Sequence, residues 1–159
     1  MAEEIPLLEF KLTKGEQLGF DGFVPIDGSS LMERALAVDF RYMAISWERA
    51  GILRLPVEDD ICFLCDAHNE LPELYTDGGL QHVYLGDGEL ELSVTVALNE
   101  ATIAQRYVPF LDRRFATSID YRVTIEQYVT AWRLLLLGIV EVVAKLELSR
   151  SGVDPGTRD

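Results

Sequence analysis

The feature of this sequence that most constrains its fold is the strict alternation of residues 89–98. Apolar side chains occupy every second position from 90 to 98, and the positions between them are mostly polar: Glu89, Glu91, Ser93 and Thr95. A period of two is the period of a β-strand, so the apolar side chains share one face. The Gly-Asp-Gly turn at 86–88 joins this strand to a second segment at 81–85. The sequence therefore predicts a hairpin in an antiparallel sheet with one buried face and one wet face.

Other segments of the chain also predict strands. They either alternate or form short apolar runs bounded by turn residues, and they lie at 7–13, 52–55, 61–65 and 118–123. Glycine, proline, asparagine and aspartate between them predict loops at 14–29 and 66–80. We therefore expect a mostly antiparallel sheet of about five strands.

Sequence patterns predict the starts of three helices. A capping box at 30–33 begins the first, which we expect to reach Ala50 because Gly51 is a typical helix stop, although positions 36–42 also alternate as a strand would. A second capping box at 124–127 begins a long helix that continues to about Leu148 with one apolar side. A short helix at 100–107 is expected after Asn99, which is a good capping residue.

These elements predict one α+β domain, in which the sheet is packed by the long C-terminal helix and by the helix after Ser30. A length of 159 residues is ordinary for one domain, and a hydrophobic share of 48% is enough for one core. The sequence contains no internal repeat and no domain boundary, so the domain covers 1–159. Glycine and proline at the end of the chain predict a frayed tail at 149–159.

The composition also predicts where the protein is found. The longest apolar run, at 134–144, is about half of the roughly 20 residues that a membrane span needs, and Glu141 interrupts it. The first four residues, Met-Ala-Glu-Glu, are acidic where a secretion signal is basic. Cys62 and Cys65 are the only cysteines, which is too few for a disulfide framework. We therefore expect a soluble, cytoplasmic protein with no membrane partner.

The acidic residues are concentrated in one third of the chain. No lysine or arginine occurs between Leu55 and Gln105, a stretch that holds eleven acidic residues. The formal net charge of the chain is −13, and the other sixteen acids and fourteen bases nearly cancel. Phosphates require Lys and Arg, so this block argues against nucleic acid as a direct ligand. A field of one sign attracts an opposite charge, so we expect a basic protein, or a cation, as the partner.

The strongest candidates for a metal or catalytic site are Cys62, Cys65, His68 and His82. They are the only cysteines and histidines of the chain, and such a set could fill a tetrahedral zinc site. In a strand at 61–65, however, the two cysteines point to opposite faces, and no helix N-terminus is predicted there to activate a thiol. The carboxylates do not match the spacing of a calcium-binding loop. We therefore expect two buried thiols, with no metal, no cofactor and no catalytic residues.

Small size, one domain, no catalytic constellation and an unbroken acidic third together resemble the immunity proteins of bacterial toxin systems. The segment Asp77-Gly78-Gly79-Leu80 before the hairpin is also similar to patterns in some of these families. The resemblance implies a stoichiometric binding protein that neutralises a basic toxin domain, and not an enzyme.

On this hypothesis the acidic segment steers the partner, and Tyr75 is an apolar anchor. The expected partner-binding residues are Asp59, Asp60, Asp66, Glu70, Glu73, Tyr75 and Asp77. The Tyr75 ring has an alternative role, which is to fold back over the sheet. Two other functions stay open: a small enzyme that binds a cationic substrate in an acidic pocket, and a dimeric structural or regulatory protein. The dimer would use the long helix, where Leu134 and Leu137 lie off the main apolar face.

Overall fold

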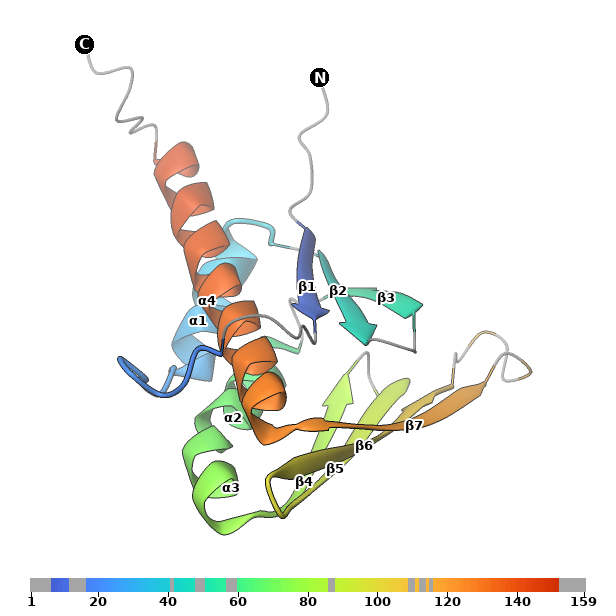
Figure 1. Ribbon diagram of the computed structural model, residues 1–159. Helices are drawn as coiled ribbons and strands as arrows, with labels where there is room; N and C mark the ends of the chain where they lie inside the picture. Colours follow the sequence, from blue (N-terminus) through green and yellow to red (C-terminus); the bar gives the residue numbers. More distant parts are fainter. Residues whose placement is uncertain are drawn as a thin grey trace.

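The computed structural model describes residues 7–11, 17–40, 42–47, 51–56, 60–85, 88–108, 111, 114 and 116–151 (Figure 1). The elements in chain order are β1 (Leu7–Lys11), α1 (Gly28–Ala37), β2 (Tyr42–Trp47), β3 (Gly51–Pro56), α2 (Ile61–Asn69), α3 (Leu71–Asp77), β4 (Gly79–Leu85), β5 (Leu90–Ala97), β6 (Glu100–Tyr107), β7 (Thr117–Thr124) and α4 (Ile125–Arg150). The predicted turn at 86–88 lies outside these residues except for Gly88, and so do residues 152–159 of the predicted tail.

The strands form two sheets. In the smaller sheet β2 lies between β1 and β3, parallel to β1 and antiparallel to β3. The larger sheet is an antiparallel meander in the order β4-β5-β6-β7. The predicted α+β class and the mostly antiparallel pairing are therefore confirmed. The prediction of one sheet of about five strands is wrong, because the described strands are divided between two sheets.

One core cluster joins the inner face of the four-stranded sheet to the helices. The helix α4 begins directly after β7, next to the sheet, and extends away from it past α1 and β1 (Figure 1). Trp132 and Tyr128, in the first half of α4, are the largest fully buried side chains of the described residues. The last turns of α4 are tied to α1 by an ion pair of 2.6 Å between Arg34 and Glu147.

The two predicted capping boxes have different outcomes. The box at the start of α4 is confirmed: the N–H of Gln127 donates to Thr124 Oγ1 at 3.1 Å, and the N–H of Thr124 donates to Gln127 Oε1 at 3.0 Å. The box at 30–33 is wrong. The N-cap of α1 is Asp27, whose Oδ1 accepts from the N–H of Ser30 at 3.2 Å.

The first helix ends well before position 50, and β2 occupies part of its predicted length. At its end Asp39 takes a positive φ of 55°, and the N–H of Phe40 donates to the carbonyl of Ala35 at 3.0 Å. These contacts form a Schellman motif, which turns the chain out of the helix. Phe40 is buried after the turn, so packing at this point outweighs the helical pattern of the sequence. Residues 48–50 lie outside the described part of the chain.

The acidic segment is helical, where a strand at 61–65 and a loop at 66–80 were predicted. Glu70, between α2 and α3, keeps helical dihedrals (φ −80°, ψ −12°). The buried side chains follow a helical spacing: Ile61, Leu64, Cys65, His68 and Leu71. An apolar run of five residues fits a strand as well as a helix, and only its continuation to Leu71 distinguishes the two.

Residues 100–107 form the strand β6, and the short helix predicted there is wrong. Ala97 pairs with Glu100, and the two residues between them, Leu98 and Asn99, have φ angles of 53° and 65°. This is the geometry of a two-residue type I′ turn. Asn99 therefore reverses the chain between two strands instead of capping a helix. The predicted hairpin of 81–85 with 89–98 is confirmed by the pairing of β4 with β5.

Residues 17–27 form an irregular segment, the strap, that side chains of α2 and α4 hold in place. Arg133 is 5% exposed; its Nη1 donates to the carbonyl of Gly19, and its Nη2 donates to that of Asp21 at 3.3 Å. The Asn69 side chain accepts from the N–H of Ile26 at 2.9 Å and donates to the carbonyl of the same residue at 2.8 Å. The predicted loop is confirmed over the strap, and residues 14–16 lie outside the described part.

Acid is expected to destabilise the fold through His68, which the strap covers. The ring is 3% exposed and stacks on Phe23 of the strap at 4.7 Å between centroids. Burial lowers the pKa of His68 below its ordinary value of 6.5. The hydrogen bond to Asn69 raises this pKa and the nearby positive charge of Arg133 lowers it, and the net shift is downward. Below pH 6.5 the unfolded chain therefore binds a proton at His68 that the folded chain does not bind. Stability should fall by up to about 1.4 kcal/mol per pH unit in that range.

The measurement is urea unfolding between pH 7 and pH 5 for the wild type and for His68→Phe. Phenylalanine keeps the ring that stacks on Phe23 and cannot titrate, so its stability should change less over this range. Parallel pH dependences of the two proteins would contradict the assignment to His68.

Candidate functional site

Four of the predicted partner-binding acids form one row along α2 and α3. Asp66, Glu70, Glu73 and Asp77 are all exposed, and they are separated by four, three and four residues. Because Glu70 keeps helical dihedrals between the two helices, this spacing places the four side chains on one side. These four residues are called the acidic row below.

Three members of the acidic row line a depression beside the start of β4. The lining residues are Glu70, Glu73, Leu74, Asp77, Gly78 and Leu80, and the depression has a volume of about 330 Å³. Leu80 is 70% exposed, which is unusual for a leucine in a strand. The depression therefore combines three carboxylates with an apolar side chain that is open to solvent.

A buried network fixes Glu70 relative to the sheet. Gln81 faces the inner side of β4 and is 3% exposed. Its Nε2 donates to the carbonyl of Ala67 at 3.1 Å and to Glu70 Oε2 at 2.9 Å, and its Oε1 accepts from the hydroxyl of Tyr128. The network joins α2, β4 and α4, so it determines where one carboxylate of the acidic row lies.

We expect Tyr128→Phe to destabilise the fold. The substitution leaves Gln81 Oε1 in the core without its donor, and an unsatisfied buried group of this kind costs about 1–3 kcal/mol. Chemical denaturation measures the loss, and Tyr84→Phe is the matched control because Tyr84 is 48% exposed. Equal stabilities of Tyr128→Phe and the control would show that the network contributes nothing.

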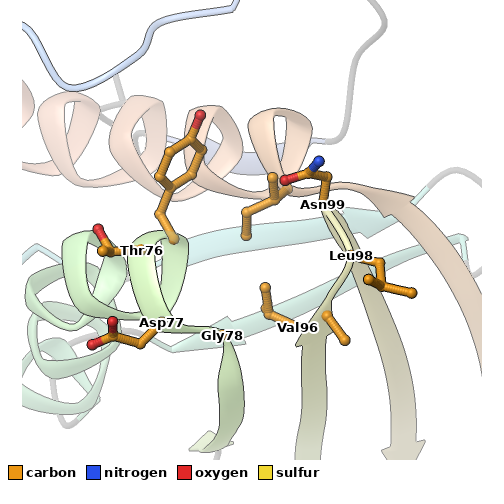
Figure 2. Close-up of a pocket in the computed structure, with 9 residues that line it drawn as sticks. Thr76, Asp77, Gly78, Val96, Leu98 and Asn99 are labelled. Atoms are coloured by element: carbon orange, nitrogen blue, oxygen red, sulfur yellow. The ribbon is translucent and has the colours of Figure 1, made fainter.

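A second hollow, drawn in Figure 2, shares Asp77 and Gly78 with the first and reaches Ile125 at the start of α4. Its lining residues are Tyr75, Thr76, Asp77, Gly78, Val96, Ala97, Leu98, Asn99 and Ile125, and its volume is about 440 Å³. Gly78 allows α3 to end this close to β5. A Cβ at Gly78 would lie 2.8 Å from the carbonyl oxygen of Val96, and its φ of 69° also favours glycine.

Tyr75 lies on the α3 side of this second hollow. Its ring packs edge-on against Phe20 of the strap, with 5.2 Å between centroids. The hydroxyl lies 3.5 Å from Glu126 Oε1, which is a long hydrogen bond. The ring therefore packs on the strap, beside a hollow that Val96 and Ala97 of β5 also line. Since 45% of the residue stays exposed, it is accessible to a partner.

Leu98 is the most unusual residue of this surface. It is 95% exposed and lies at the rim of the second hollow (Figure 2). Its φ of 53° is left-handed, a conformation that costs an L-residue without a polar side chain roughly 1–2 kcal/mol. The type I′ turn requires this left-handed conformation, so the turn holds a nonpolar side chain in solvent at a cost in backbone free energy.

The structure does not place all of the predicted residues on this surface. Asp60 is only 4% exposed and stands directly before α2, so it offers a partner little surface. Its neighbour Asp59 lies outside the described residues. The sequence-based set omits Leu80 and Leu98, since one was assigned to a loop and the other to the end of a buried strand. The type I′ turn preference for Asn99 is the signal that could have located Leu98.

The cysteines and histidines do not converge. Cys62 and Cys65 lie three residues apart on a helix and not on opposite faces of a strand, and Cys62 Sγ is 3.6 Å from Met32 Sδ. Burial raises the pKa of the Cys65 thiol to about 12, so it stays protonated and poorly nucleophilic near neutral pH. His68 lies under the strap, while His82 lies on the outer face of β4. Among the described residues, no three His, Cys, Asp or Glu side chains are placed to hold a metal ion.

These features define an α+β protein with an acidic, partly apolar surface at one end of its four-stranded sheet. In the described part of the chain, none of the helices combines the length and the apolar character that crossing a membrane requires. Comparisons with protein-family models, with curated proteins and with solved structures found no match.

Proposed function

We propose that this protein binds a basic protein partner in a stoichiometric complex and that it acts as a binding protein, not as an enzyme. The observation that carries the proposal is the continuity of the surface: the acidic row, the two hollows that share Asp77 and Gly78, and the exposed Leu80 and Leu98. Protein interfaces commonly combine apolar contacts with charged groups that complement the partner.

The charge of this surface has no local counter-charge in the sequence. The elements that form most of it, α2, α3, β4 and β5, lie in the stretch between Leu55 and Gln105, which contains no lysine or arginine. A field of one sign raises the rate at which an oppositely charged protein finds the surface. The exposed apolar side chains then supply short-range contacts that lengthen the life of the complex.

The resemblance in overall character to the immunity proteins of bacterial toxin systems indicates the kind of partner. In this proposal the partner is a basic toxin domain, which the protein inhibits by covering its active site or an adjacent surface. No chemistry by this chain is required, because inhibition comes from occupancy alone.

Capture of the partner tests the proposal. The protein is used as bait at low ionic strength in an extract of its source cells, and bound proteins are eluted with rising salt. We expect one basic protein, and native mass spectrometry of the eluted complex should give a one-to-one ratio. A complex that resists high salt, or a bait that captures only acidic proteins, would contradict the electrostatic mechanism.

The size of the free protein separates this proposal from the dimer hypothesis. Leu134 and Leu137 are exposed on α4, at 51% and 48%, and a dimer would bury them. A monomer in light scattering, together with capture of a basic partner, supports the binding function proposed above.

A further inference from the structure

The strand β4 forms an edge of the four-stranded sheet. It pairs with β5 on one side, and in the part of the chain that the structure describes no strand pairs with its other side. The pairing with β5 is continuous from Gly79 to Leu85, without a bulge. Such an edge presents backbone donors and acceptors that another chain can use.

The direction of these backbone groups follows from one hydrogen bond at the end of the neighbouring strand pair. The N–H of Val108 donates to the carbonyl of Glu89 at 2.8 Å, so the backbone groups of Glu89 point towards β6. Directions alternate along an antiparallel strand, so those of Leu90 point towards β4 and bond to Leu85. By the same alternation along β4, the backbone groups of residues 80, 82 and 84 point to the free side of the strand.

The side chains of these three positions leave the edge open. Leu80, His82 and Tyr84 lie on the exposed outer face, and the strand carries no proline and no lysine or arginine. Natural sheets usually protect an edge with charges, prolines or bulges. The opposite edge, β7, has such protection, because Asp120 and Arg122 are exposed there. An unprotected edge beside a candidate interface is a site for strand addition.

The acidic row indicates which strand would fit. Gln81 faces the inner side of β4 and its amide bonds Glu70, so this member of the acidic row lies beside the edge on the inner side, and Glu73 and Asp77 line the same depression. An added strand would direct alternate side chains towards these carboxylates and the remaining ones towards the outer face, beside Leu80 and Tyr84. Basic side chains complement the first set of positions, and small apolar side chains complement the second.

We propose that an extended segment of the partner, in which Lys or Arg alternates with apolar residues, adds to the sheet as a strand beside β4. This inference rests on the proposed function and specifies its binding mode: backbone hydrogen bonds to residues 80, 82 and 84, with the basic side chains on the acidic row. Direct contact with the backbone makes the binding depend on the partner's conformation as well as on its charge.

Synthetic peptides test the strand addition. The probe is the capped heptapeptide Lys-Val-Lys-Val-Lys-Val-Lys, and two further versions carry N-methyl groups on the valine amides or on the lysine amides. All three have the same charge. An added antiparallel strand uses the valine amides and a parallel one uses the lysine amides, so one methylated version should bind about tenfold more weakly or worse than the parent. The amides of residues 80, 82 and 84 should exchange more slowly with the parent peptide bound.

Variants of the protein provide the matching test. His82→Pro removes an N–H that points to the free side, so it should weaken the binding of the parent peptide as N-methylation of the peptide does. His82→Thr keeps this N–H and should leave the binding unchanged. Equal binding of all three peptides, or no binding of the parent at low salt, overturns the strand addition. Failure of the proposed function gives a different result. Neither a basic peptide nor a basic protein would then show binding that depends on salt and that the Glu70→Lys, Glu73→Lys double variant weakens.

Discussion

Replacing both Glu70 and Glu73 by lysine is expected to slow association with the basic partner by about 30- to 100-fold at low ionic strength, within the range over which charge steering changes association rates. The two carboxylates lie in the acidic row and line the depression beside Leu80. Their reversal places two positive charges between Asp66 and Asp77, which cancels the attraction at the centre of the row. The dissociation rate should change less, because exposed charges act mainly on encounter.

The control has the same net charge as this variant. Glu33→Lys with Glu141→Lys also changes the formal charge from −13 to −9, since each reversal adds two units, but these exposed residues lie on α1 and α4. Stopped-flow association at several salt concentrations compares the two proteins. If the control slows association as much as the Glu70 and Glu73 variant, the whole-molecule charge and not the acidic row steers the partner. An unchanged rate in both would sink the assignment of this surface.

Local signals in the sequence predicted the parts of the fold that local contacts determine. The β4–β5 hairpin follows from alternation that continues over the whole second strand, and the start of α4 follows from the reciprocal hydrogen bonds of Thr124 and Gln127. Each of these signals is complete within a few neighbouring residues. They therefore hold whatever surrounds them.

The errors occurred where two patterns compete and tertiary packing decides between them. The run at 61–65 is too short to separate a strand from a helix, and burial of Leu64, His68 and Leu71 against the rest of the core selects the helix. The chain turns out of α1 at Asp39 because Phe40 is buried there. The residues of the run itself do not indicate the helix, and nothing next to Asp39 in the sequence indicates that Phe40 is buried.

The candidate site was predicted in its charge but not in its shape. The absence of lysine and arginine between Leu55 and Gln105 identified the acidic segment. The arrangement of four acids in a row depends on α2 and α3 being helices, so a loop prediction could not supply it. Leu80 and Leu98 were missed because apolar residues in strand patterns are ordinarily buried, and their exposure is a property of the folded surface.

Leu98→Asn is expected to make the protein more stable and its complex weaker. Asparagine tolerates the left-handed conformation at this first position of the type I′ turn, so the free energy of unfolding should rise by about 0.5–1 kcal/mol. The same substitution removes an apolar side chain that is 95% exposed in the free protein. If that side chain enters the partner, its loss should cost about 2 kcal/mol of binding, or roughly 30-fold in Kd.

The opposite signs of the two effects separate a contact residue from a structural one. Denaturant unfolding gives the stability, and calorimetric titration with the captured partner gives Kd. Leu111→Asn is the matched control, because Leu111 is fully exposed and lies on no element of the acidic surface, so its Kd should not change. A loss of stability in Leu98→Asn would mean that the side chain packs within the fold. A gain in stability with unchanged Kd would place the turn outside the interface. Stability gained together with affinity lost is the result expected when a strained residue is retained because the partner binds it.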